Sequence, residues 1–168
     1  ALNDGQVPIY EPGLDELMAQ HAERLTYTLS LERLLERSDI VFIAVDTPPS
    51  YSGDADLSRV MGFVEELANL GTDARQILVM KSTVPVGTGR RVRQMLEARG
   101  LHNVGYVSNP EFLKEGDAIA DFMNPDRVVI GASDPEHADR VAGLYDPLQA
   151  HILRTSVPTA EMVKYASN

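Results

Sequence analysis

The side chains most able to do chemistry in this sequence gather in three short polar clusters. Each cluster directly follows an apolar run typical of a fully buried parallel strand. In chain order, the runs and their clusters are 40–45 with 46–48, 77–80 with 81–83, and 104–107 with 108–111. In an open parallel sheet, ligands bind in the crevice beyond the carboxyl ends of the strands. The three clusters are therefore predicted to form one composite site.

The third cluster continues into the most distinctive segment, residues 109–116. Asn109 can cap a helix and Pro110 suits its first position, which predicts a short helix whose N-terminus faces the crevice. Glu111 and Glu115 would then lie one turn apart on the same face. Such a pair offers two carboxylates beside free backbone donors. The alternative is that these acids only complement the helix dipole.

Hydroxyl groups and a proline stand at the ends of the other two runs. Ser82 and Thr83 are adjacent and can orient a water molecule or a carboxamide. The alternative is that both hydroxyls only satisfy the backbone of their own turn. Thr47 offers the same choice, and Pro48 stiffens a wall against which a flat ring can lie.

The last predicted helix carries a lysine and an amide four residues apart, Lys164 and Asn168. Residues at this spacing project from one face of a helix. A lysine and an amide that point together suit the stabilisation of a developing oxyanion. The alternative is a solvated Lys164 that pairs with Glu161.

Two other kinds of site are not expected. Residues 87–92 come close to the dinucleotide-binding fingerprint, but Val92 replaces the third glycine and the stretch does not follow a strand directly. We interpret it as the start of a helix. The four histidines lack ligand spacing and the sequence has no cysteine, so neither a metal site nor a nucleophile–histidine pair is expected.

The composition indicates one globular domain. The chain has 168 residues, of which 43% are hydrophobic and 24% charged. Its net charge of -10 disfavours binding to nucleic acid or to an anionic membrane, because both are polyanions. Without cysteine, a signal-peptide pattern or an apolar run of ~20 residues, a cytoplasmic protein is the simplest interpretation.

The elements that must position the clusters alternate between strands and helices. Further strands are predicted at 25–29, 127–131 and 151–155. Helices are predicted over 14–25, 30–37, 56–71, 88–99, 135–148 and 156–168, with Ser30, Asp56, Asp134 and either Thr155 or Ser156 as caps. This alternation predicts an α/β fold, a doubly wound and mostly parallel sheet with helices on both faces.

Taken together, the motifs closely resemble those of the UDP-glucose 6-dehydrogenases, in the UDP-glucose/GDP-mannose dehydrogenase family. In chain order, the motifs are 3–5, 8–14, 45–49, 81–88, 108–116, 124–127 and 161–165. The resemblance extends over nearly the whole chain. It implies a Rossmann-like NAD-binding domain and the four-electron oxidation of UDP-glucose to UDP-glucuronate by two successive NAD⁺ molecules. In this family the aldehyde is held on a cysteine as a thiohemiacetal and then a thioester, which water cleaves.

The resemblance also implies roles for individual residues. Glu111 resembles the carboxylate that assists thioester hydrolysis, and Thr83 resembles the hydroxyl that positions the water. Lys164 and Asn168 resemble the pair that stabilises the oxyanion at the sugar C6.

Further residues resemble those that bind the two ligands. Residues around the nicotinamide end of NAD are matched by Thr47, Pro48, Ser82, Thr83 and Glu115. The segment along which the nucleotide sugar lies is matched by Phe112, Leu113 and Lys114, with Glu111, Lys164 and Asn168 also facing the substrate.

The sequence departs from the family pattern in two ways. The family begins with a strand, a glycine-rich phosphate loop and a helix that are not found here, and its catalytic cysteine has no counterpart. We expect residues 1–155 to be a partial dinucleotide-binding domain and 156–168 to begin the helix that leads to a central domain. The isolated chain is expected to bind NAD weakly, if at all, and to turn over nothing.

Alternative functions remain open at this point. A related dehydrogenase acting on GDP-mannose or a UDP-N-acetyl amino sugar is one, and a non-catalytic binding or assembly module is another. Without the first strand, one sheet edge would lack a partner, so we expect a homo-oligomer.

Overall fold

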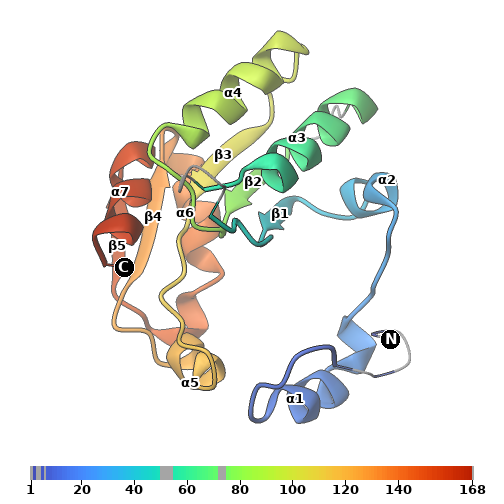
Figure 1. Cartoon of the computed structure of the whole chain (residues 1–168), viewed down its shortest axis with the longest axis vertical. Helices are drawn as coiled ribbons and strands as arrows, with labels where there is room; N and C mark the ends of the chain where they lie inside the picture. The colour runs from blue at the N-terminus through green and yellow to red at the C-terminus, as the bar shows by residue number, and fades with distance from the viewer. Residues whose placement is uncertain (1, 3–4, 6, 50–54, 72–74, 168) are drawn as a thin grey trace.

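The computed structural model describes residues 2, 5, 7–49, 55–71 and 75–167 (Figure 1). Its centre is a five-stranded sheet in the spatial order β1-β2-β3-β4-β5. The strands are β1 (Ile40–Ile43), β2 (Ile77–Met80), β3 (Gly105–Ser108), β4 (Val128–Ala132) and β5 (Ile152–Thr155). All neighbours are parallel except β3 and β4, which are antiparallel. The predicted mostly parallel α/β fold is therefore confirmed.

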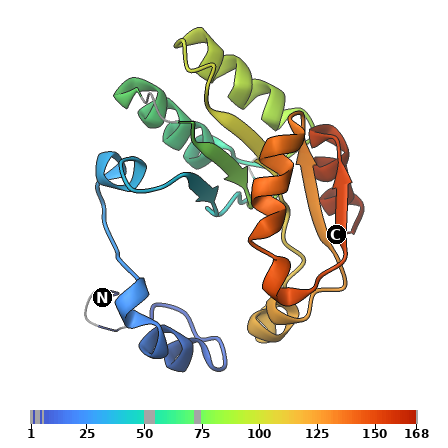
Figure 2. The same cartoon turned by 180° about the vertical axis from the view of Figure 1, so that it is seen from behind.

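Helices cover both faces of the sheet because side chains alternate along each buried strand. On β2, Leu78 and Met80 pack in one core cluster with the helices α3 (Ser58–Leu70) and α4 (Thr88–Ala98). Ile77 and Val79 pack on the opposite face with α6 (Pro135–Gly143). Figure 2 shows α6 on the side of the sheet away from α3 and α4.

The N-terminal part of the chain differs from its prediction. It contains α1 (Leu14–Gln20), a short 3-10 helix (Ala22–Arg24) and α2 (Leu31–Leu35). The strand predicted at 25–29 is wrong: this stretch is irregular, and Leu29 is fully exposed. Alternating apolar residues form a strand only where a neighbouring strand accepts their backbone hydrogen bonds.

Most predicted helix starts are confirmed by their capping bonds. Ser30 Oγ accepts from Arg33 N at 3.2 Å, and Asp134 Oδ1 accepts from Glu136 N at 2.9 Å. Ser156 Oγ accepts from Thr159 N at 3.3 Å at the start of α7 (Val157–Ser167). Asp56 stands one position before the helix cap, where its Oδ1 accepts from Ser58 N at 2.8 Å.

The ends of three helices were predicted too late. α1 ends at Gln20 rather than Leu25, α2 ends at Leu35 rather than Arg37, and α6 ends at Gly143. Tyr145 lies in the turn that follows α6 and Leu148 in a second 3-10 helix (Asp146–Leu148), and both pack against the core. No helix within the described ranges is both long enough and apolar enough to cross a bilayer.

The glycine-rich stretch after β2 begins α4, as predicted. The N–H groups of Gly87 and Gly89 both donate to the carboxylate of Glu161 on α7, each at 2.7 Å. Glu161 is 2% exposed, and this burial raises its pKa. The carboxylate thus occupies the two N–H groups that a phosphate would need.

Candidate active site

The polar clusters after the parallel strands leave the sheet side by side. Ile43 of β1 lies opposite Met80 of β2, and Met80 lies opposite Ser108 of β3. The segments that begin at 44, 81 and 109 therefore start next to one another. This confirms the predicted meeting of the three clusters at one edge of the sheet.

Side-chain hydroxyls tie the first two segments together. Ser82 Oγ accepts from Val45 N at 2.8 Å and donates to Val45 O at 2.5 Å. Thr47 Oγ1 donates to Thr83 O at 2.7 Å. Ser82 and Thr47 thus bond to backbone, although to the neighbouring segment rather than to their own turn. The structure records no partner for the Thr83 hydroxyl among the described residues, so this group can bind water or ligand.

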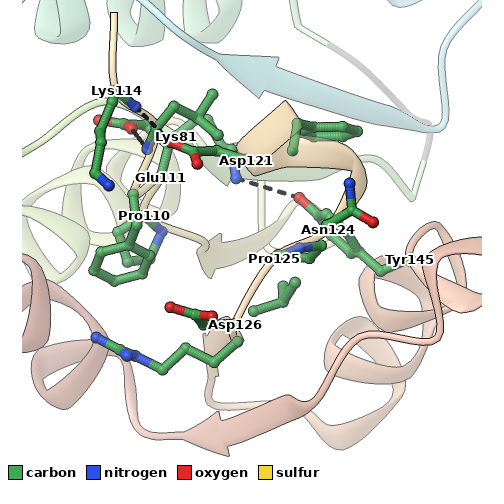
Figure 3. Close-up of a pocket in the computed structure, with 14 residues that line it drawn as sticks. Lys81, Pro110, Glu111, Lys114, Asp121, Asn124, Pro125, Asp126 and Tyr145 are labelled. Carbon is green, nitrogen blue, oxygen red and sulfur yellow. Dashed lines mark hydrogen bonds between the residues drawn. The ribbon is translucent and has the colours of Figure 1, made fainter. Parts of the chain in front are cut away.

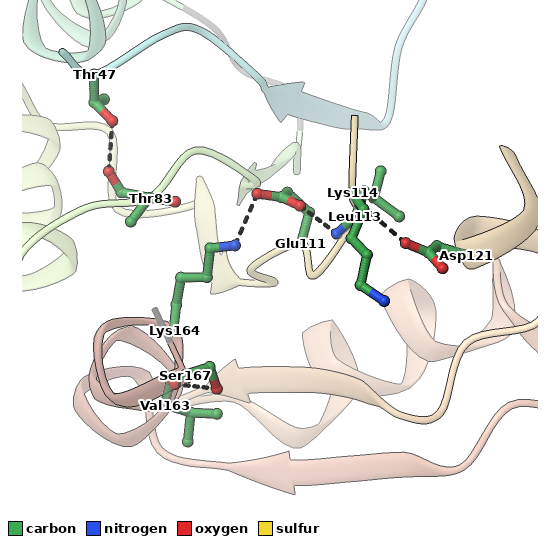
Figure 4. A network of polar contacts seen from close by, with 9 residues as sticks. All are labelled: Thr47, Thr83, Glu111, Leu113, Lys114, Asp121, Val163, Lys164 and Ser167. Atoms are coloured by element: carbon green, nitrogen blue, oxygen red, sulfur yellow. Dashed lines mark hydrogen bonds and ion pairs between the residues drawn. The ribbon is translucent and has the colours of Figure 1, made fainter. Parts of the chain in front are cut away.

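Lys164 forms an ion pair with Glu111. Lys164 Nζ lies 2.9 Å from Glu111 Oε1, and the two side chains are 9% and 31% exposed (Figure 4). Lys164 Nζ also lies 5.3 Å from the centre of the Phe112 ring, within the range of a cation–π contact. The alternative pairing of Lys164 with Glu161 is wrong, because Glu161 binds the start of α4.

The short helix predicted after Asn109 does not form. Residues 110–114 are irregular, a turn follows at 115–116, and the next helix is α5 (Ala118–Met123). Glu111 Oε2 instead accepts from Leu113 N at 2.6 Å. Glu115 is exposed in the turn and does not share a helix face with Glu111.

Asn109 explains why that helix is absent. Its side chain is fully buried, donates to Val129 O at 2.9 Å and accepts from Tyr145 Oη at 2.5 Å. Lys81 Nζ donates to the same Asn109 oxygen at 3.2 Å. Because this oxygen is already bonded, it does not cap a helix. Asn109 instead links the end of β3 to β4 and to the segment after α6.

A pocket opens beside this network (Figure 3). Its volume is ≈ 190 Å³. It is lined by the predicted substrate segment, by residues of α5, of the chain between α5 and β4 and of the start of β4, and by one residue just after β2 and one just after α6. The lining residues are Lys81, Pro110, Glu111, Phe112, Leu113, Lys114, Asp121, Phe122, Asn124, Pro125, Asp126, Arg127, Val128 and Tyr145.

The predicted site residues divide between the lining of this pocket and segments outside that lining. Glu111, Phe112, Leu113 and Lys114 line the pocket. Lys164 reaches Glu111 from α7. The predicted nicotinamide residues belong to the loops after β1 and β2 and to the turn after Lys114: these are Thr47, Pro48, Ser82, Thr83 and Glu115. Asn168 lies outside the described residues.

Sequence reasoning missed some pocket residues. Tyr145 was included only in the helix predicted over 135–148, and the sequence did not predict the hydrogen bond from its hydroxyl to Asn109. Arg127, which stacks over Phe112 with its guanidinium carbon 5.1 Å from the ring centre, was assigned only to a strand and to a motif. The 124–127 motif was the available signal, since all four of its residues line the pocket.

Lys81 occupies a low-dielectric position among charged neighbours. Burial lowers its pKa to about 8, the Lys164 charge adds to this decrease, and the Glu111 carboxylate opposes it. Its Nζ also donates to Tyr145 Oη at 3.3 Å. Burial raises the pKa of Tyr145 to about 12, so the tyrosine remains a neutral donor to Asn109 at physiological pH.

The pKa of Lys81 predicts a pH-dependent stability. Because the folded state releases this proton more easily than the unfolded chain, the free energy of unfolding should rise between pH 8 and the ordinary lysine value of 10.5. Lys81→Met keeps the apolar stem and removes the titrating group. Urea denaturation should show wild type gaining on this variant by at least about 1 kcal/mol across that range. A difference that does not change with pH would contradict the assignment.

Comparison with known proteins agrees with this geometry. Residues 1–149 match the model of the NAD binding domain of the UDP-glucose/GDP-mannose dehydrogenase family. A UDP-glucose 6-dehydrogenase of Bacillus subtilis is 41% identical over the whole chain, and one of Rhizobium meliloti is 45% identical. The chain spans 37% and 40% of these two proteins.

Solved structures show the same likeness. A ternary complex of GDP-mannose dehydrogenase from Pseudomonas aeruginosa matches with a TM-score of 0.94 at 35% identity. A UDP-glucose dehydrogenase from Pyrobaculum islandicum matches with a TM-score of 0.90 at 38% identity. Each match covers 99% of this chain and 40% of the other. The likeness therefore includes the whole sheet and the segments that carry the site.

Proposed function

The chain belongs to the UDP-glucose/GDP-mannose dehydrogenase family, and on this premise we propose that it forms part of an NAD-dependent dehydrogenase that oxidises a nucleotide sugar. In this proposal, residues 1–155 contribute to the NAD-binding domain and 156–168 begin the helix that leads out of it. The observation that carries the proposal is the ion pair between Lys164 and Glu111 at the carboxyl edge of the sheet. A cytoplasmic location is part of the same proposal.

NAD is the cofactor of the matching family domain, and the residues at the ends of β1 and β2 fit its nicotinamide end. The bonds of Ser82 and Thr47 hold the two loops together, and Pro48 is exposed beside them. Glu115 would approach the same end from the turn before α5. When bound, NAD⁺ accepts a hydride from the substrate. The N–H groups of Gly87 and Gly89 do not contribute, because Glu161 occupies both.

The proposed catalytic groups act on the sugar C6. Lys164 lies 2.9 Å from an acid in a partly buried position, where a cation stabilises a developing alkoxide more strongly than in water. Glu111 is the proposed base for hydrolysis. The Thr83 hydroxyl, which has no recorded partner among the described residues, would hold the attacking water. Asn168, four residues after Lys164, would share its role. The sugar would lie along Phe112–Lys114, against the pocket wall.

We propose UDP-glucose as the substrate and UDP-glucuronate as the product. This choice is supported by the curated relatives at 41% and 45% identity, both of which are UDP-glucose 6-dehydrogenases. GDP-mannose is the second candidate, because the structural match with a TM-score of 0.94 is a GDP-mannose dehydrogenase. A UDP-N-acetyl amino sugar is the third.

The test is a panel of these nucleotide sugars with the full-length protein that contains this chain. We expect two NADH per UDP-glucose and a kcat/KM at least about tenfold above that for GDP-mannose. A preference for another sugar would reject UDP-glucose. No NADH with any nucleotide sugar would reject the enzyme in favour of a binding or assembly module.

We further propose that the 168-residue chain by itself is inactive. It contains no cysteine to carry the thioester that the family resemblance implies. Calorimetry should detect no micromolar NAD binding to this chain, and no NADH should form with UDP-glucose. Either signal would contradict this part of the proposal.

The exposed edge of the sheet favours association of the protein with itself. Among the described strands, β1 pairs only with β2, and Phe42 at its centre is 41% exposed. Unpaired strand edges promote pairing between chains. We propose a homo-oligomer, which light scattering of the 168-residue chain would detect. A monomer at all accessible concentrations would reject it.

A further inference from the structure

The pocket wall between β3 and α5, residues 110–117, has few backbone–backbone hydrogen bonds. Residues 110–117 belong to no helix or strand, and within the described part of the chain only the N–H of Asp117 among them has a recorded backbone partner, Lys114 O at 3.1 Å. Leu113, Lys114 and Gly116 are exposed, so without a protein acceptor their N–H groups would bond to water, which does not hold the backbone in one conformation. The position of this wall therefore depends on the side chains that accept its hydrogen bonds.

Three carboxylates supply these acceptors. Glu111 accepts from Leu113 N at 2.6 Å, and Asp121 accepts from Lys114 N at 2.9 Å. Glu11 accepts from Gly116 N at 2.9 Å through one oxygen and from Ala118 N at 2.8 Å through the other. Glu11 is the only one of the three that comes from a distant part of the chain, more than 100 residues earlier.

The turn that Glu11 holds has little rigidity of its own. Gly116 has φ 89°, a left-handed conformation that glycine adopts freely and leaves as easily. Both of the bonds to Glu11 are charge-assisted, which makes them stronger than neutral hydrogen bonds. Removing them would allow the turn to sample other conformations and would release the pocket wall that precedes it.

Glu11 itself is fixed by its surroundings. Leu14 N donates to Glu11 O at 3.1 Å, which closes the turn through Pro12 and Gly13 into α1. Figures 1 and 2 both show α1 below the sheet, with α5 as its neighbouring helix. No residue of α1 is buried, so little apolar packing attaches this segment. Among the described residues, the recorded hydrogen bonds between the N-terminal segment and the pocket wall are the two that Glu11 accepts.

We propose that Glu11 is a positioning residue for the nucleotide-sugar pocket. It fixes the turn at Gly116 and, through this turn, the Phe112–Lys114 wall against which the substrate is proposed to lie. We call the two bonds from Gly116 N and Ala118 N to Glu11 the clamp. The kinetic consequence of losing the clamp rests on the proposed function, whereas the clamp itself does not. Loss of these bonds should weaken substrate binding rather than chemistry, because the recorded bonds of the Glu11 carboxylate go to Gly116 N and Ala118 N and, among the described residues, not to Thr83, Glu111 or Lys164.

The test compares Glu11→Ala and Glu11→Gln with the wild type in the full-length protein. Glu23→Ala is the matched control, since Glu23 is an exposed acid of the same N-terminal segment. Hydrogen–deuterium exchange of a peptide covering 112–119 reads out the clamp. In Glu11→Ala this peptide should exchange roughly tenfold faster or more, with β2 and β3 unchanged. Glu11→Gln keeps one acceptor oxygen, so the exchange rate of its peptide should lie between those of wild type and Glu11→Ala.

Steady-state kinetics of the same proteins read out the function. Glu11→Ala should raise the KM for the nucleotide sugar roughly tenfold and leave kcat within about twofold. Unchanged exchange at 112–119 would overturn the clamp, and faster exchange with an unchanged KM would overturn its positioning role. If no nucleotide sugar is oxidised even by wild type, the proposed function fails while the exchange result still decides the clamp.

Discussion

Replacing Lys164 with alanine should lower the kcat of the full-length dehydrogenase by about a hundredfold to a thousandfold. The ammonium lies 2.9 Å from Glu111 and the Lys164 side chain is 9% exposed, so water replaces it poorly. Its loss leaves a partly buried carboxylate without its partner and removes the proposed stabilisation of the oxyanion at C6. The measurement is NADH formation at saturating UDP-glucose and NAD⁺.

Two further variants separate catalysis from folding. Lys164→Met keeps the apolar stem near Phe112 and should lose as much kcat as the alanine variant. Arg93→Ala removes a cation from the surface of α4, where it pairs with Glu97 at 3.2 Å, and should leave kcat unchanged. A loss of less than about threefold in both Lys164 variants would contradict its catalytic role.

Gly131→Ala should destabilise the protein by about 3 kcal/mol or more. Gly131 is on β4, and a Cβ there would lie 2.5 Å from Ala160 Cβ and 2.7 Å from Ser156 O. The Ser156 carbonyl is backbone at the start of α7, so the clash is relieved only if the helix moves off the sheet. That movement would also displace Lys164.

Gly62→Ala is the matched control for this change. Gly62 is exposed on α3 and has open space around its Cα, so alanine should be neutral or raise stability by up to about 1 kcal/mol. Urea denaturation of both variants makes the comparison. A Gly131→Ala protein within about 1 kcal/mol of wild type would show that α7 packs less tightly on β4 than described.

The strands could be predicted because their signal is local. The run 77–80 is fully buried on both faces, and its unbroken apolar character is what such a position requires. The stretch 25–29 has the alternating apolar pattern of a half-buried strand, but it has no neighbouring strand among the described residues, and the sequence does not say where a partner lies. Loop and helix boundaries depend on these distant partners and were predicted less well.

The site shows the same division. Glu111, Thr83 and Lys164 could be proposed as site residues because they stand in specific motifs. Their contacts could not, since Asn109 bonds to Tyr145, 36 residues away, in preference to capping a local helix. Likewise Glu161 bonds to Gly87 and not to Lys164, three residues from it. In each case a long-range contact replaced the local one that spacing alone favours.

The most direct test of the central claim is a structure of the full-length protein with NAD and UDP-glucose bound. We expect the sugar to lie along Phe112–Lys114, with its C6 oxygen about 3 Å from Lys164 Nζ and close to Glu111. A sugar bound elsewhere, with Lys164 and Glu111 still paired only to each other, would contradict it.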